Sequence, residues 1–132
     1  MLLLLDNYDS FTYILQDYFS QLQSSCTVIR NDDKTIDEIV GLQPSGIIFS
    51  PGPETPSKAG IMMQLISHYY DKIPLLGICL GHQAIGEFFG ASLVKAKMPM
   101  HGRTSLIHHE HHPLFHNINT PFQAMRYHSL IL

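Results

Sequence analysis

The sequence has few of the residues that mark several classes of protein. Among its 132 residues there are no tryptophans and only two cysteines, and charged residues make up 14%. Cys26 and Cys79 form neither a CxxC pair nor a dense disulfide framework, which favours a reducing compartment and predicts a cytoplasmic protein. Eight Lys and Arg against eleven Asp and Glu leave no basic run, so we expect no nucleic-acid partner. The opening apolar run, residues 1–5, is too short for a signal peptide or a membrane span, so we expect no membrane partner.

The sequence does have the material for one core. Hydrophobic residues make up 45% of the chain. A chain of this length can bury roughly two-thirds of its unfolded surface without a metal or a disulfide. We therefore expect a single domain over residues 1–132.

Apolar periodicity predicts an α/β fold. Short apolar runs predict buried strands at residues 2–5, 26–30, 46–50 and 74–78, and apolar residues at helical spacing lie between them. Asp9 or Ser10 is expected to cap the first helix, and Thr35 with Glu38 has capping-box spacing for the second. Strands that alternate with helices predict a parallel sheet with helices on both faces. From residue 91, short runs at 91–94, 104–107 and 122–126 predict antiparallel strands at the sheet edge.

One loop has the pattern of a nucleophile. In Gly77-Ile78-Cys79-Leu80-Gly81 the cysteine stands between a buried strand and a helix, as in a nucleophile elbow. The glycines are needed because a Cβ beside the tight turn would collide with the neighbouring strand and helix. The helix N-terminus is expected to favour the thiolate, and the N–H of Leu80 to stabilise an oxyanion. Most single cysteines are buried and inert, which is our interpretation of Cys26, but this frame favours Cys79 as a nucleophile.

Five motifs in order extend the pattern over the whole chain. They are Asp6-Asn7-Tyr8-Asp9-Ser10-Phe11-Thr12-Tyr13, Ser50-Pro51-Gly52-Pro53, Gly77-Ile78-Cys79-Leu80-Gly81-His82-Gln83, His101-Gly102-Arg103-Thr104-Ser105 and Arg126-Tyr127-His128-Ser129-Leu130. Together they resemble the class I glutamine amidotransferases, and most of all the amidotransferase subunits of anthranilate synthase and aminodeoxychorismate synthase. The resemblance implies a three-layer, flavodoxin-like fold.

The resemblance also implies an activity and its residues. L-Glutamine would be hydrolysed through a Cys79 thioester, without a cofactor or a metal, and the ammonia would pass to a chorismate-binding synthase subunit. The backbone amides of Leu80 and Gly52 would be the oxyanion donors, and Pro53 would help to fix the Gly52 loop. Gln83 would contact the glutamine side chain. Ser129 and Leu130 would make main-chain contacts to the α-carboxylate and amine of the substrate.

Two residues depart from the family pattern. Glu54 stands where the family often has a second glycine, which puts a close backbone approach at that position in doubt. Arg103 stands where lysine is usual and keeps the charge.

The His and Glu of the triad are the larger departure. A cysteine nucleophile needs a histidine to move protons and a carboxylate to orient it. In the family both come from a His-Pro-Glu segment after the Arg126–Leu130 motif, and Leu132 is the last residue here. We therefore expect a C-terminally truncated amidotransferase domain that is inactive or impaired. His108-x-Glu110 has suitable residue types, but it precedes the Arg126–Leu130 motif and is not expected to reach the elbow. His82 and His128 are the other candidates, and His82 is expected to point away from the substrate.

Two other interpretations remain at this point. The histidine-rich residues 108–112 fit a solvated loop better than a metal site, because no cysteine or carboxylate cluster accompanies them. The chain could also be a non-catalytic glutamine-binding or regulatory protein, or another hydrolase with a cysteine elbow, such as a γ-glutamyl hydrolase. The motifs at residues 6–13 and 101–105 argue against the hydrolase.

Overall fold

A computed structural model describes all residues, 1–132, and divides the chain into two compact units. The first unit is Met1–Leu93 together with Leu132, and the second is Val94–Ile131. None of the helices is long and apolar enough to cross a membrane.

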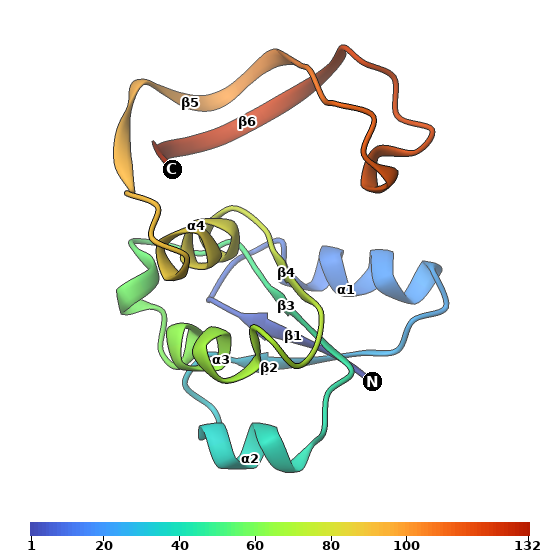
Figure 1. Cartoon of the computed structure of the whole chain (residues 1–132), viewed down its shortest axis with the longest axis vertical. Helices are drawn as coiled ribbons and strands as arrows, with labels where there is room; N and C mark the ends of the chain where they lie inside the picture. Colours follow the sequence, from blue (N-terminus) through green and yellow to red (C-terminus); the bar gives the residue numbers. More distant parts are fainter. The chain divides into compact units, whose positions relative to one another are not determined.

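The first unit contains a four-stranded, fully parallel sheet, as the alternation of strands and helices predicts (Figure 1). Its strands are β1 (Leu2–Asp6), β2 (Cys26–Arg30), β3 (Gly46–Phe49) and β4 (Leu75–Gly77). They lie in the order β2-β1-β3-β4. Because parallel strands share a direction, the loops after β1, β3 and β4 leave the sheet at one edge.

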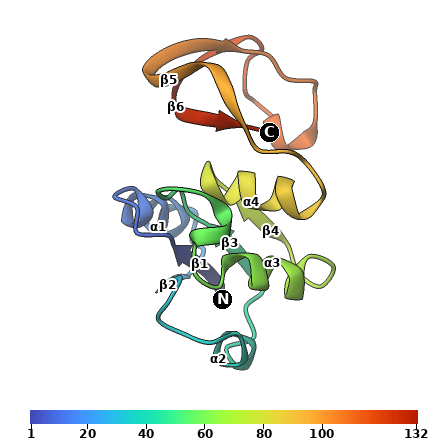
Figure 2. The same cartoon turned by 90° about the vertical axis from the view of Figure 1, so that its left-hand side faces the viewer.

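Four α-helices cover the two faces of this sheet. They are α1 (Thr12–Gln21), α2 (Ile36–Gly41), α3 (Met62–Tyr69) and α4 (Leu80–Phe88), with a short 3₁₀ turn, η1 (Pro56–Lys58). Figure 2 shows α1 on one side of the strands and α3 on the other. The main core lies on the side of α2, α3 and α4, where helical residues pack against Leu3, Leu5, Ile47 and Phe49. This arrangement confirms the fold class that the sequence predicts.

The first helix differs from its prediction. Phe11 is the N-cap residue and makes no side-chain cap, although Asp9 accepts a hydrogen bond from the N–H of Phe11 at 2.7 Å. Thr12 is the only fully buried residue of α1, and the apolar residues Ile14 and Tyr18 are exposed. Helical spacing therefore identified the helix but not which of its apolar residues face the sheet.

Local signals placed α2 and the end of α4 correctly. Thr35 and Glu38 form the expected capping box, and α2 ends at Gly41. Beyond α4, Gly90 has φ +91°, a left-handed conformation that glycine adopts without a Cβ clash.

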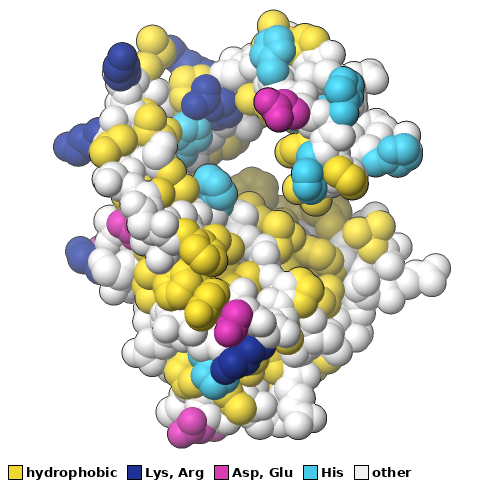
Figure 3. All heavy atoms as spheres, viewed as in Figure 1, with side chains coloured by type: hydrophobic (Ala, Val, Ile, Leu, Met, Phe, Trp, Pro, Cys, Tyr) yellow, Lys and Arg dark blue, Asp and Glu magenta, His cyan; other side chains and the backbone are white.

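The second unit is a pair of antiparallel strands, β5 (Val94–Ile107) and β6 (Phe122–Ile131). The antiparallel pairing is as expected, but the pair forms its own two-stranded sheet instead of adding to the edge of the parallel one. The connection between them contains a 3₁₀ turn, η2 (Pro113–Phe115). Figure 3 shows several histidine side chains on the surface of this connection.

Candidate active site

Three of the loops at the carboxyl edge of the sheet contain one non-glycine residue with positive φ. Tyr8 follows β1 with φ +61°, Glu54 follows β3 with φ +62°, and Cys79 follows β4 with φ +52°. Such conformations cost free energy and persist only where the surrounding structure fixes them. Gln23 and Gln43, which follow α1 and α2, have positive φ as well, so backbone strain by itself does not distinguish this edge.

Cys79 occupies the elbow that its glycine frame predicts. It is the N-cap residue of α4, and the residue is exposed. A Cβ on Gly77 would overlap the carbonyl group of Gly81. A Cβ on Gly81 would lie 2.5 Å from both the Cβ and the carbonyl oxygen of Phe49. Both glycines are therefore required because two backbone segments approach each other closely. At Gly77 the turn approaches α4, and at Gly81 the helix approaches β3.

The electrostatics of the thiol differ from expectation. Although the residue as a whole is exposed, partial desolvation of the thiol raises the pKa of Cys79; the N–H of Leu80 lowers it, and the negative charge of Asp9 raises it again. The net direction is upward. A general base that takes the proton of the thiol would offset this shift.

The structure brings the Gly52 loop next to the start of α4. A Cβ on Gly52 would lie 2.9 Å from Cδ2 of Leu80, and Leu80 is 1% exposed. Pro53, the next residue, is exposed. The two residues that the sequence assigns as oxyanion donors, Gly52 and Leu80, are thus neighbours.

A buried polar network supports this edge, and the sequence analysis did not assign it a role. Asn7 is 1% exposed, and its amide donates to the carbonyl of Ser50 at 3.0 Å and to the sulfur of Met62 at 3.4 Å. Its Oδ1 accepts from the amide of Asn31 at 3.0 Å. The backbone N–H of Asn7 donates to Oγ of Ser50 at 2.9 Å. Asn7 therefore links the loops after β1, β2 and β3.

The side chains of Glu54 and Tyr8 each contact charged residues nearby. The carboxylate of Glu54 lies 3.2 Å from Nζ of Lys58. The hydroxyl of Tyr8 donates to the carboxylate of Asp32, and the guanidinium of Arg30 lies over its ring, 5.1 Å from the centroid. The positive φ of Glu54 is a conformation that a glycine would adopt without strain.

The other predicted substrate residues lie in both units. Gln83 is buried on α4, and its backbone N–H donates to the carbonyl of Cys79 at 2.9 Å. Ser129 is exposed and Leu130 half-buried on β6 of the second unit. Their contacts to a glutamine therefore stay a prediction.

The candidate histidines are held in different ways. His82 is exposed on α4. Nε2 of His128 accepts from Nε of Arg126 at 3.0 Å. The ring of His109 has Nε2 at 3.0 Å from the carbonyl of Ile118, and it stacks on Phe115. Over residues 1–132 no group of three or more His, Cys, Asp or Glu side chains is placed to hold a metal ion.

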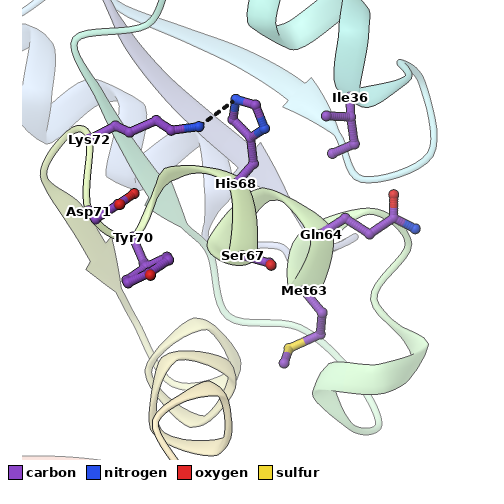
Figure 4. A pocket seen from close by; sticks show the side chains of 8 residues that line it. All are labelled: Ile36, Met63, Gln64, Ser67, His68, Tyr70, Asp71 and Lys72. Carbon is purple, nitrogen blue, oxygen red and sulfur yellow. Dashed lines mark hydrogen bonds between the residues drawn. The ribbon is translucent and has the colours of Figure 1, made fainter.

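Several cavities adjoin the first unit's elements. One of about 710 Å³ is an open groove beside α3 (Figure 4), where Lys72 and His68 point toward each other with their nitrogens 3.3 Å apart. Another, about 520 Å³, is lined mainly by residues 32–38. A third, about 260 Å³, lies at the carboxyl edge and is lined by residues that include Asn7, Pro53 and Leu80. Of these three, only the last adjoins the residues assigned to the oxyanion site.

Comparisons with known proteins agree with this geometry. The sequence profile of the family "Glutamine amidotransferase class-I" matches residues 3–132. The chain is 48% identical over 132 residues to anthranilate synthase component 2 of Pseudomonas aeruginosa and to aminodeoxychorismate/anthranilate synthase component 2 of Bacillus subtilis. It is covered completely in both alignments and covers 66% and 68% of those relatives.

A solved structure shows the same fold. A glutamine amidotransferase from Thermotoga maritima superposes with a TM-score of 0.80 at 18% identity, over 98% of this chain and 60% of that one. The chain spans about two thirds of the length of the curated relatives. With the elbow cysteine, its glycine frame and these matches, the chain belongs to the class I glutamine amidotransferase family.

Proposed function

We propose that this chain is the glutaminase part of a synthase that uses chorismate. The observation that carries the proposal is Cys79, held in a left-handed conformation at the N-terminus of α4 beside the Gly52 loop. The relatives are components of anthranilate and aminodeoxychorismate synthases. The substrate would be L-glutamine, and the partner a synthase subunit that binds chorismate and receives the ammonia.

The chemistry would proceed in two steps on the thiol of Cys79. The thiolate attacks the side-chain carbonyl carbon of glutamine, forming a C–S bond and an oxyanion that the N–H groups of Leu80 and Gly52 stabilise. The oxyanion collapses, the C–N bond breaks, and ammonia leaves after gaining a proton. Water then attacks the thioester, releasing glutamate and the thiol.

Proton transfer is the step for which this chain is least equipped. The first attack needs a base that takes the proton of the Cys79 thiol. Residues 1–132 contain no His-x-Glu sequence after the Arg126–Leu130 motif. We therefore expect residues 1–132 by themselves to turn glutamine over slowly or not at all, while Cys79 remains open to alkylation.

A glutamine-directed alkylating reagent tests the proposal. A chloromethyl ketone analogue of glutamine should label Cys79, as read by peptide mass spectrometry, and L-glutamine should protect it. Cys79→Ser should abolish the labelling. Cys26→Ser is the matched control, because Cys26 lies half-buried in β2 and should not affect the reaction. Labelling that survives Cys79→Ser would remove Cys79 from the mechanism.

A second candidate is a glutamine-binding subunit without turnover, because residues 1–132 contain no His-x-Glu sequence after the Arg126–Leu130 motif. The same samples separate the two functions. Protection by glutamine without any release of ammonia, in residues 1–132 and in a longer chain that carries a His-x-Glu segment, would support binding alone. Ammonia release that depends on Cys79 would support the glutaminase.

A further inference from the structure

We propose that Asn7 is a positioning residue for the oxyanion site: its buried amide holds the Gly52 loop beside the N-terminus of α4. This inference rests on the proposed function, because it needs an oxyanion to stabilise. Asn7 makes none of its hydrogen bonds to Cys79, so it would act through Gly52.

The contact between Asn7 and Gly52 is a direct backbone approach. A Cβ on Gly52 would lie 2.6 Å from Cβ of Asn7 and 2.8 Å from its carbonyl oxygen. The two residues are therefore packed against each other with no room for a side chain on Gly52. Any displacement of Asn7 changes where the Gly52 peptide lies.

Hydrogen bonds fix Asn7 in this place from two sides. Toward β3, its amide and its backbone N–H hold the carbonyl and the hydroxyl of Ser50, two residues before Gly52. Toward β2, its Oδ1 accepts from Asn31, whose carbonyl accepts the N–H of Ile61 at 2.9 Å. Both faces of the Asn7 side chain are thus used.

The chemistry of an amide suits this position better than its alternatives. An aspartate would keep the acceptor for Asn31 but would place a carboxylate oxygen against the carbonyl of Ser50. An alanine would leave that buried carbonyl without its donor, which costs about 1–3 kcal/mol in general. Because oxyanion donors work only when they are fixed before the reaction, a small shift of Gly52 should slow acylation more than it slows other thiol reactions.

Two probes of Cys79 separate these effects. The S-phenyl γ-thioester of N-acetyl-L-glutamate acylates the thiolate: a C–S bond to Cys79 forms through an oxyanion, and thiophenolate leaves. Iodoacetamide alkylates the same thiolate by direct displacement of iodide, with no oxyanion. The ratio of the two rate constants cancels changes in the fraction of thiolate and reports on the oxyanion site.

We expect Asn7→Ala and Asn7→Asp to lower this ratio about 10- to 100-fold. This effect is equal to or smaller than the fall in rate when a known enzyme loses one oxyanion donor. Intact-mass spectrometry of residues 1–132 gives both rates, and thermal unfolding shows that each variant is folded. Ser50→Ala is a milder variant that removes the hydroxyl which accepts the Asn7 N–H and donates to the carbonyl of Pro51 at 2.7 Å, and it should lower the ratio about threefold to tenfold. It keeps the inference testable if the Asn7 variants do not fold.

Thr12→Val is the matched control. Thr12 is as buried as Asn7 and donates to the carboxylate of Asp6 at 2.7 Å, but it supplies none of the three atoms nearest to a Cβ on Gly52. Its ratio should equal that of the wild type. Two results would overturn the inference about Asn7 but leave the proposed function standing. One is an unchanged ratio in folded Asn7 and Ser50 variants, and the other is an equal fall of the ratio in Thr12→Val. If the thioester does not acylate wild-type Cys79, the proposed function fails and the inference fails with it.

Discussion

The two units of the chain differ in what holds their backbones in place. Every fully buried residue lies in Met1–Leu93, and none lies in Val94–Ile131. The second unit has left-handed backbone only at Gly102 and Asn117, residue types that tolerate it. The first unit has positive φ at five non-glycine residues: Tyr8, Gln23, Gln43, Glu54 and Cys79. Strained backbone thus occurs mainly where a packed core can compensate for its cost.

The same difference predicts where the stability of the chain lies. A single pair of strands is marginally stable in water, whereas a sheet packed against helices can be stable by itself. We therefore expect global unfolding to be governed by the first unit and the β5–β6 pair to open locally at lower free energy.

The largest contrast is expected between two glycine substitutions. Gly81→Ala places a Cβ 2.5 Å from the backbone of Phe49 and should lower the free energy of unfolding by roughly 3–5 kcal/mol. Gly102→Ala places a Cβ in ordinary contact with the ring of Tyr127, 3.6 Å away, and should cost only the left-handed backbone, about 1–2 kcal/mol. Urea unfolding followed by circular dichroism measures both. Equal losses would contradict the contrast between the units.

Leucine truncation gives a second, smaller contrast. Leu4 is 0% exposed in β1 and Leu106 is 61% exposed in β5. Leu4→Ala should cost about 2–5 kcal/mol and Leu106→Ala less than about 0.5 kcal/mol. The comparison would fail if Leu106→Ala lowered the urea midpoint as much as Leu4→Ala.

Much of the fold could be predicted because its signals are local. The four apolar runs became β1–β4, and Thr35 with Glu38 formed the capping box from four consecutive residues. The packing of α1 could not be predicted, because the residues that face β1 and β2 depend on how the helix lies on the sheet. For the same reason, the short runs at 91–94, 104–107 and 122–126 indicated antiparallel strands, but they predicted neither one long strand over Val94–Ile107 nor a sheet separate from the parallel one.

The candidate site divides in the same way. The GxCxG pattern placed Cys79 in its elbow, because the two glycines are needed within five residues of sequence. The support from Asn7 is invisible in the sequence, since its partner Ser50 lies 43 positions away. The raised pKa of Cys79 was missed because burial, its largest cause, arises from tertiary packing.

The smallest expected effect lies within the first unit and concerns the thiol itself. The carboxylate of Asp9 disfavours the thiolate and contributes to the raised pKa of Cys79. Asp9→Asn removes the charge and keeps an acceptor for the N–H of Phe11. The pKa should therefore fall, and iodoacetamide should react about twofold faster at neutral pH, where the thiolate is the minor form. The rate measured against pH should show its midpoint moving to lower pH. Asp17→Asn is the control, because it removes a charge from α1 that does not act on the thiol, and it should leave the midpoint in place. An equal shift of the midpoint in both variants would mean that the pKa of Cys79 responds only to the net charge of the chain.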